Sequence, residues 1–460
     1  MESTMASSSL PNVPDLHRAV INNDTETVKE LTSKVPRIIN EEYHGKTAIY
    51  SAITNENIPM VKLLFGLGVD INSISYCIEY CAKETPVVTA ARCRQPKIVE
   101  ILLAKYKQDD NIESQLPKSA LQWAAGNGDI ETARLLLSNG ADVNWIGSYF
   151  RTALHYATYS DHAEMVNLLL DHDANVTIDA DGRSPLHVAS VRGNLTIVQY
   201  LTKKSIPLDQ IDNFGFSPLD LACLRGHVKV AEHLLTLNRG LDVNSALMQS
   251  AENNHIPCMQ LLLDFGADIN FRNSNLETPL HVATYRHAES TEFLIEKNAN
   301  MDLKDSRDYT PVQNAVIKDR VEVLRILIQH GARVTGIEHT SQINIAMKHK
   351  NPELIQWLIY GGYKLQIDRG LNQTFLKRQL NILSQTPLSL QTADLKADIE
   401  CHIFLLERQS NALSLKELSR LCLRSRLQEV RNGKSIKAGI GALPLPNRLK
   451  DYVAILNCSI

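Results

Sequence analysis

Several signals that would assign this chain to a functional class are missing. No part of its 460 residues forms an apolar run of about 20 residues, the length that a helix needs to cross a bilayer. The motifs of common enzymes are absent too: a Gly-rich phosphate loop, His-Glu-x-x-His and Gly-x-Ser-x-Gly. Residues 1–12 are rich in serine and lack the apolar segment of a signal peptide. We therefore expect a non-catalytic intracellular protein without membrane insertion, in the cytoplasm with the nucleus as a second location; an enzyme with an unrecognised site is the alternative.

Cysteine is scarce and scattered, with 8 residues in the whole chain. Cys77, Cys81 and Cys93 form the one cluster, and its C-x₃-C spacing has no matching second pair, although His44 is nearby in sequence. Since the composition is otherwise that of a cytosolic protein, reduced thiols are expected in place of disulfides. We expect no metal and no other cofactor; a zinc site at this cluster is the alternative.

A strong charge of either sign is also missing. The chain has 48 Lys and Arg against 51 Asp and Glu, a formal charge of −3, and 44% hydrophobic residues, which is typical of a soluble globular protein. Nucleic-acid binding is therefore not expected. Residues 413–460 hold nine Lys or Arg and three Asp or Glu, a local +6, so the other 412 residues carry −9. A solvated helix face explains the basic tail, and steering of an acidic partner or RNA binding are the alternatives.

What the sequence does contain is a repeat. Residues 152–157 (TALHYA), 184–189 (SPLHVA) and 278–283 (TPLHVA) are each followed by an apolar run and then by a Gly-Ala-Asp-Val-Asn-like turn. The position of the last alanine in this phrase recurs about every 33 residues. It is occupied by Ala19, Ala52, Ala90, Ala124, Ala157, Ala189, Ala222, Ser250, Ala283, Ala315 and Ala346. The sequence therefore predicts about eleven units over residues 14–368.

The residue types predict a helix pair in each unit. Thr or Ser caps the first helix with its side-chain oxygen, and Pro in the first turn loses no hydrogen bond. Leucine runs such as 135–137 lie in the second helix, and Gly140 and Gly266 follow it, where a left-handed residue ends a helix. His155, His187 and His281 occupy one repeated position, which indicates a structural hydrogen bond near the turn.

These phrases are the ankyrin signature, and the chain resembles ankyrin-repeat proteins over residues 14–368. The resemblance implies an all-α fold, an ankyrin solenoid of about eleven helix-turn-helix repeats with short β-turn fingers and an extended concave surface. Two intervals are irregular: an insertion spans about 73–84, and residues 242–244 run directly into Ser245 where a finger is nearly lost. Insertions in repeat proteins map to loops and often to binding surfaces.

The last fifty residues have a different pattern. Residues 414–424 (SLKELSRLCLR) place leucines at 415, 418, 421 and 423, which gives a short helix one apolar face. Such a helix is marginal alone in water, so the pattern indicates docking into a groove on a partner. Residues 443–446 (LPLP) follow, with Leu449 and Tyr452 at fixed spacing. The alternative for this segment is that it only ends the chain on its last helices.

An ankyrin array followed by this tail resembles the ankyrin-repeat and SOCS-box family, whose members are substrate receptors of cullin-RING ubiquitin ligases. The family helix that enters elongin C is matched by Ser414, Leu415 and Leu423, with Leu418 on the same segment, whereas Ser419 replaces the family cysteine. Burying a hydroxyl there weakens elongin binding unless the serine bonds back to a helix carbonyl. The segment that selects cullin-5 in the family is matched without exception by Leu443, Pro444, Leu445, Pro446, Leu449 and Tyr452.

This resemblance implies the domains and the function. Residues 1–13 form a flexible tail, 14–368 the array, 369–412 a helical linker and 413–460 the SOCS box, with its elongin-binding helix at 414–424 and its cullin-selecting segment at 443–453. The expected partners are elongin B/C, cullin-5 with a RING protein and an unknown target, which the complex ubiquitinates for proteasomal degradation. A ligase-independent ankyrin scaffold with a weakened SOCS box is the alternative.

The target is expected on the array. In ankyrin proteins the residue before the signature alanine points to the concave face, and four consecutive units here carry large apolar groups at that position. The turn at 145–150 adds three aromatic residues, a grouping typical of interface anchors. The predicted contacts are Trp123, Trp145, Tyr149, Phe150, Tyr156, Tyr159, Val188 and Leu221. The alternative is that the aromatic rings pack on one another or on a neighbouring helix.

Overall fold

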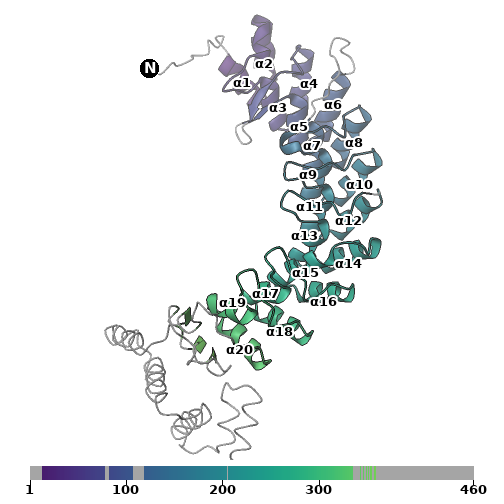
Figure 1. The fold of residues 1–460 in the computed structure, drawn as a ribbon. Helices are drawn as coiled ribbons and strands as arrows, with labels where there is room; N and C mark the ends of the chain where they lie inside the picture. Colours follow the sequence, from purple (N-terminus) through teal and green to yellow (C-terminus); the bar gives the residue numbers. More distant parts are fainter. Residues whose placement is uncertain are drawn as a thin grey trace, which may run out of the picture. The chain divides into compact units, whose positions relative to one another are not determined.

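The computed structural model of the protein describes residues 13–77, 82–106, 119–204 and 206–334, and nine scattered positions between 342 and 358. In these residues twenty α-helices follow one another along the chain (Figure 1). They form ten αα-hairpins, each made of a first and a second helix. The first helices are α1 (Val13–Ile21), α3 (Ala48–Thr54), α5 (Pro86–Arg92), α7 (Ala120–Asn127), α9 (Ala153–Tyr159), α11 (Pro185–Arg192), α13 (Pro218–Leu224), α15 (Val243–Glu252), α17 (Pro279–Thr284) and α19 (Pro311–Ile317). The second helices are α2 (Thr25–Lys34), α4 (Ile58–Gly66), α6 (Pro96–Tyr106), α8 (Ile130–Ser138), α10 (Ala163–Asp171), α12 (Leu195–Thr202), α14 (Val228–Leu237), α16 (Ile256–Asp264), α18 (Ala288–Glu296) and α20 (Val321–Gln329).

The described chain divides into two compact units. The first comprises the residues up to Ala222 together with Lys229–Leu241, and the second comprises Cys223–Val228 and the residues from Asp242 onward. In the first unit α5, α7, α9 and α11 pack side by side in one row and α6, α8, α10 and α12 in another (Figure 1). In the second unit α15, α17 and α19 form one row and α16, α18 and α20 the other.

The predicted all-helical stack is confirmed, and the signature alanines explain its core. Ala52, Ala124, Ala157 and Ala283 are completely buried, as is Ser250 at the same position. Their small side chains let neighbouring first helices approach, and leucines of the second helices fill the remaining space. The predicted eleventh repeat, around Ala346, falls where the structure describes only single positions.

The helix ends follow the predicted local chemistry. Gly140 and Gly266 have φ of +87° and +91°, the left-handed conformation that ends α8 and α16. In the shortened repeat, the Asp242 carboxylate accepts hydrogen bonds from the backbone N–H groups of Asn244 and Ser245 and so caps α15 directly. The division between the two units falls at this shortened repeat.

The predicted insertion forms a hairpin. Strands β1 (Ser75–Cys77) and β2 (Ala82–Glu84) pair antiparallel, with Ser75 opposite Glu84 and Cys77 opposite Ala82. Short 3₁₀ segments also occur, η1 (Pro36–Asn40) and η2 (Ser148–Phe150). In the described residues no helix has the length and apolar character required to span a bilayer.

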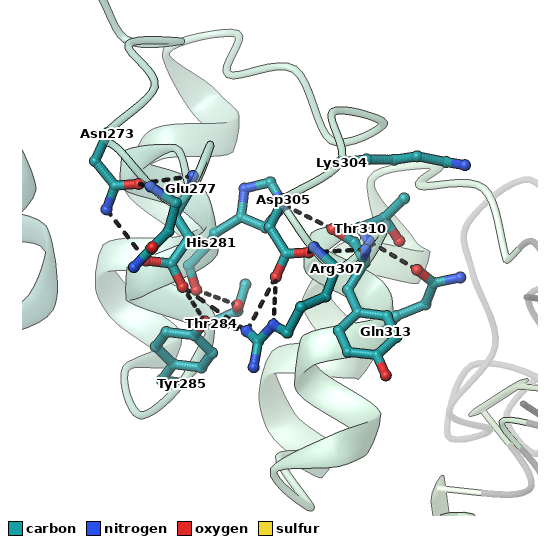
Figure 2. A network of polar contacts seen from close by, with 12 residues as sticks. Asn273, Glu277, His281, Thr284, Tyr285, Lys304, Asp305, Arg307, Thr310 and Gln313 are labelled. Atoms are coloured by element: carbon teal, nitrogen blue, oxygen red, sulfur yellow. Dashed lines mark hydrogen bonds and ion pairs between the residues drawn. The ribbon is translucent and has the colours of Figure 1, made fainter.

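The repeated histidines have the predicted structural role. The Nδ1 atoms of His155, His187 and His281 each lie 3.2 Å from the backbone N of the helix cap three residues earlier and accept its hydrogen. Since Nδ1 accepts, Nε2 carries the proton and donates to a carbonyl in the following finger, at 2.9–3.3 Å. Each imidazole therefore ties one repeat to the next. Gln313 replaces histidine in α19, where its Oε1 accepts from the Thr310 N–H at 2.7 Å (Figure 2).

Candidate functional site

Exposed apolar side chains gather on three successive fingers of the first unit. Tyr149 and Phe150 are 71% and 65% exposed, far more than large aromatic residues usually are in a folded core. Four further large hydrophobic side chains on these fingers are exposed. We call the whole set the finger patch: Ile146, Tyr149, Phe150, Ile178, Ile211 and Phe214. Apolar groups clustered in this way mark interaction surfaces.

Backbone hydrogen bonds hold the three finger tips together. The N–H of Ala180 donates to the carbonyl of Tyr149 at 2.9 Å, which joins the first finger to the second. The N–H of Asn213 donates to the carbonyl of Asp181 at 3.0 Å, and its side-chain amide donates to Ala180 O at 3.1 Å. The patch is therefore built on a connected backbone, in which each tip is positioned by its neighbour.

The backbone beneath the two aromatic residues is strained. Tyr149 and Phe150 have φ of +58° and +56°, and the tips of the next two fingers use Gly182 and Gly215 for the left-handed turn. A left-handed non-glycine residue costs about 1–2 kcal/mol because Cβ approaches the carbonyl oxygen. An aromatic residue kept at such a position, with its ring in solvent, points to a functional reason for its presence.

Two arginines form the base of the patch. The Arg151 guanidinium lies 4.5 Å from the centre of the Tyr159 ring and 5.7 Å from that of Tyr149. Its Nε is 3.5 Å from Oδ2 of the buried Asp179, to which the Tyr159 hydroxyl also donates. Burial raises the pKa of Tyr159 above its ordinary value, so the hydroxyl remains a donor at neutral pH.

The next finger repeats this arrangement. Arg183 Nε donates to the buried Asp212 carboxylate at 3.0 Å, and its guanidinium lies 5.4 Å from the centre of the Phe214 ring. Both arginines are therefore anchored from below by a buried carboxylate while they support an aromatic ring above, a cation–π arrangement. The Tyr149 and Phe214 rings thus each lie beside a guanidinium that is held in place by a buried carboxylate.

The structure separates the residues predicted to contact the target. Trp145, Tyr149 and Phe150 lie on one finger, while Trp123 on α7 and Tyr156 on α9 are half-buried on neighbouring first helices. Tyr159 is half-buried and takes part in the Asp179 network.

Two of the predicted contacts require correction. Val188 on α11 and Leu221 on α13 are 1% and 2% exposed and belong to the core. Both occupy the position before the signature alanine, where an exposed side chain was expected. A valine or leucine is too short to reach past the adjacent first helices, whereas the rings of Trp123 and Tyr156 are long enough to remain partly accessible.

Four members of the finger patch were not predicted from the sequence: Ile146, Ile178, Ile211 and Phe214. Each lies just before or within a glycine-containing turn, where an apolar side chain is unusual. An apolar residue in such a turn is the sequence signal for this surface, but it is weak for any one residue. It becomes informative only when the fingers are known to be joined.

The other predicted sites are less fully described. Cys77 is buried and Cys93 is partly buried, while Cys81 lies outside the described residues. Among the residues that are described, no three His, Cys, Asp or Glu side chains are placed to hold a metal ion. All predicted elongin-binding and cullin-binding residues, from Ser414 to Tyr452, also lie outside the described part of the chain.

Comparison with known proteins identifies both parts of the chain. The family model for ankyrin repeats matches residues 16–115, 87–180, 172–246 and 247–338, and the model for the SOCS box matches residues 411–454.

Curated relatives share the repeats over part of their length. The ankyrin repeat and KH domain-containing protein mask-1 of Caenorhabditis elegans is 27% identical over 62% of this chain and 11% of its own length. The human transient receptor potential cation channel subfamily A member 1 is 27% identical over 69% of this chain and 33% of its own. The Arabidopsis thaliana E3 ubiquitin-protein ligase XBAT33 is 32% identical over 36% of this chain and 32% of its own. The chain thus spans a third or less of these relatives. Among solved structures, the human ASB11 ankyrin repeat domain matches with a TM-score of 0.42 and 26% identity, over 47% of this chain and 99% of that domain.

Proposed function

The chain belongs to the ankyrin-repeat and SOCS-box family, and on this basis we propose that it is the substrate-recognition subunit of a cullin-5-type ubiquitin ligase. The observation that supports this proposal most strongly is the SOCS-box match at residues 411–454 in the same chain as the ankyrin array. The ankyrin array captures a target protein, and the SOCS box recruits elongin B/C and cullin-5 with its RING protein.

The chain itself is non-catalytic in this proposal. A RING-bound, ubiquitin-loaded enzyme modifies lysines of the captured protein, which is then degraded by the proteasome. The array contributes to the rate by holding the target close to that enzyme, which converts a bimolecular encounter into an effectively intramolecular one.

Elongin binding is assigned to the helix at 414–424. Leu415 and Leu423 supply apolar contacts, and Ser419 stands where related boxes bury a cysteine. A buried hydroxyl without a partner costs about 1–3 kcal/mol, which corresponds to a weakening of up to about a hundredfold. A hydrogen bond from Ser419 to a carbonyl one turn earlier would remove much of that cost.

Cullin selection is assigned to the segment at 443–453. Pro444 and Pro446 restrict the backbone to an extended conformation, so Leu443 and Leu445 are presented at little further entropic cost. Leu449 and Tyr452 follow at the spacing of an amphipathic helix and complete the apolar contact. In the elongin-binding helix, Leu418 adds to the apolar face.

The finger patch is the proposed target surface, together with Trp123 and Tyr156 on the adjacent helices. The rings of Tyr149, Phe150 and Phe214 are exposed. Anchored arginines lie beside the Tyr149 and Phe214 rings, and Tyr149 and Phe150 have a left-handed backbone. Preorganised aromatic anchors lose little entropy when a partner binds, which favours affinity.

A pull-down with purified elongin B/C, with and without the cullin-5 N-terminal domain, tests the ligase assignment. Wild type should capture both in stoichiometric amounts. Leu415→Ala should lose elongin B/C and therefore cullin-5, whereas Leu445→Ala should retain elongin B/C and lose only cullin-5. Each variant is the control for the other. Ser419→Cys should strengthen elongin capture.

Failure of the wild type to bind elongin B/C would refute the ligase proposal. It would favour the second candidate, a scaffold that uses only its ankyrin array, for which Ser419 is the specific observation. Recovery of binding in Ser419→Cys would then identify the broken contact.

The target surface needs a separate comparison. Phe150→Gly removes a ring from the finger patch and also relieves a left-handed backbone. Leu276→Gly is the control: it relieves a left-handed backbone in the second unit, at φ +57°, outside the patch. Proteins captured from cells by wild type and Leu276→Gly but not by Phe150→Gly are the candidate targets. Equal capture by both variants would remove the finger patch from the proposal.

A further inference from the structure

Exposed cations recur at one position of successive repeats in the second unit. The position lies in the turn between the first and second helices, three residues after the signature position. In four consecutive repeats it holds exposed side chains, which we call the turn row: Arg225, Asn253, Arg286 and Lys318. Because one position of a repeat faces the same side in every stacked repeat, these side chains follow one another along one face.

Hydrogen bonds hold the four turns together. Three of them join a turn to the repeat that follows, at 2.8–3.1 Å: His255 Nε2 donates to the Leu224 carbonyl, Ser290 N to Asn254 Oδ1, and Arg320 Nε to the Tyr285 carbonyl. Lys318 Nζ also lies 5.4 Å from the centre of the Tyr285 ring, one repeat earlier. Each turn is therefore tied to its neighbour, so the fold sets the spacing of the row.

Two arginines of the row differ from the other arginines of the second unit. Arg225 and Arg286 make no hydrogen bond or ion pair within the described part of the chain, although both are exposed on an array of net negative charge. The other five described arginines of this unit each bond to an acid or to a backbone carbonyl: Arg272, Arg307, Arg320, Arg325 and Arg333. The two guanidinium groups of the row therefore have their planar sets of N–H donors available for a ligand.

The first unit shows which group occupies this position when it is filled. Arg192 holds the same position of its repeat, and its guanidinium lies 2.7 Å from the Asp161 carboxylate of the preceding repeat. In the repeats of α15 and α17, Asn254 and His287 stand where Asp161 stands in the repeat of α9. The fold thus supplies a carboxylate to this position in the first unit and supplies none from these two repeats of the second.

We propose that the turn row binds an acidic segment of a partner protein, with one carboxylate opposite each of Arg225, Arg286 and Lys318. The pair of Arg192 and Asp161 is the internal precedent, because there a carboxylate already occupies this position. The proposal goes beyond the ligase function: it assigns a second surface, outside the finger patch, and requires no SOCS-box partner.

The geometry of the row sets the pattern of acids in the segment. Helices α15, α17 and α19 pack in sequence, and packed helices lie about 8–10 Å apart. Since an extended chain advances about 3.3 Å per residue, neighbouring repeats correspond to positions about three residues apart. Asn253 follows the exposed Glu252, so the segment should be uncharged opposite this turn. The expected pattern is acid, uncharged, acid, acid at intervals of about three residues.

A polypeptide fits this pattern better than a nucleic acid does. A nucleic-acid strand carries one phosphate about every 3.4 Å, so it would place charges beside Glu252 as well as beside the cations. The chain outside residues 413–460 carries −9, which disfavours such a continuous line of negative charge. A polypeptide can place its acids opposite the cations alone, and the two oxygens of a carboxylate match the paired N–H donors of a guanidinium.

Anisotropy titrations of the full-length protein with fluorescent dodecapeptides test the proposal. Two peptides carry Glu at positions 2, 8 and 11 or at positions 2, 5 and 11, which covers both chain directions, with Ala, Ser and Gln elsewhere. One control peptide has the three Glu side by side, and another has Gln in their place. At low salt the better of the two spaced peptides should bind about tenfold more tightly than the Gln peptide, through three exposed ion pairs. Salt at about 0.5 M should remove most of this difference by screening.

Two charge-matched double variants locate the site. Arg225→Gln/Arg286→Gln should remove the preference for Glu, and because neither arginine bonds to another described residue, the fold should be unchanged. Arg325→Gln/Arg333→Gln also removes two arginines of the second unit, each paired with an acid of its own, and should keep the preference. Circular dichroism checks the fold of both.

Equal binding of the spaced Glu peptides and the Gln peptide would overturn the proposal. So would equal binding of the spaced and the side-by-side Glu peptides, because the row would then not align its ligand. An equal loss in both double variants would show that overall charge, and not the turn row, binds the peptide. Tighter binding of a single-stranded RNA dodecamer than of any Glu peptide would replace the acidic polypeptide with a nucleic acid. None of these results bears on elongin or cullin capture, so the two proposals fail separately.

Discussion

The cap histidines should make the array lose stability in mild acid. His155, His187 and His281 are buried, and each accepts a backbone hydrogen bond at Nδ1 while Nε2–H donates to the next finger. Burial lowers the pKa of each below 6.5 in the folded protein, because the charged imidazolium is poorly solvated there. Protonation at Nδ1 would also leave the cap N–H of the helix without its acceptor.

Proton linkage gives the direction and the size of the change in unfolding free energy with pH. Below pH 6.5 the unfolded chain binds protons that the folded chain does not, so stability is complete above 6.5 and falls as pH decreases toward the folded pKa. Each histidine contributes a slope of at most about 1.4 kcal/mol per pH unit, or about 4 kcal/mol per unit for three. Asp305 has a pKa lowered from 3.8 despite its burial, through hydrogen bonds from Tyr309 and Arg307, so it titrates well below this window.

The assay is urea unfolding followed by circular dichroism at pH 7.5, 6.0 and 5.0. The comparison variant replaces His155, His187 and His281 with glutamine, for which Gln313 provides the natural precedent in α19. Wild type should show a falling urea midpoint, and the triple variant a much smaller fall. Among the described residues, His17 is then the remaining buried imidazole of lowered pKa. An equal fall in both proteins would refute the reasoning, since the cap histidines would then not be the source.

Three further predictions rest on single contacts. Phe150→Gly should be more stable than Phe150→Ala by about 1 kcal/mol in thermal melts, because glycine alone relieves the left-handed backbone while both remove the ring; equal stability would contradict the strain. Arg92→Ala should lower the free energy of unfolding by about 3–5 kcal/mol. In the wild type Arg92 Nε lies 3.0 Å from the buried Glu84 carboxylate, and the substitution leaves that carboxylate without its charge partner. Arg325→Ala removes a partly exposed ion pair within a helix and should lower the free energy of unfolding by less than about 1 kcal/mol. Equal losses in the Arg92 and Arg325 variants would refute the distinction between buried and exposed pairs. Asp129→Ala should cost about 1 kcal/mol and speed hydrogen exchange in the first turn of α8, because it removes the acceptor of the Thr132 N–H.

Much of the fold could be predicted from short stretches of sequence. The Thr-Pro starts, the glycine stops and the period near 33 predicted the helix pairs, because capping and left-handed termini depend on a few adjacent residues. The role of His155 followed from its repetition at one position. The insertion near 73–84 was located as well, and the structure shows it as the β1–β2 hairpin.

The exposed apolar surface of the fingers was predicted less completely. Tyr149 and Phe150 were found because three aromatic residues in one turn stand out locally, and the structure leaves both exposed. Val188 was predicted by the same rule as Trp123 but lies in the core, because exposure before the signature alanine depends on side-chain length and on the helices packed alongside.

The sequence by itself determined the period, the helix pairs, their caps and the SOCS-box motif, since each is specified by residues close together in the chain. Only the tertiary structure decided which apolar side chains form one surface. Ile178 and Phe214 are 36 positions apart, and they belong to the finger patch because backbone hydrogen bonds join successive fingers. Such surfaces arise from contacts between repeats, and no pattern within a single repeat specifies them.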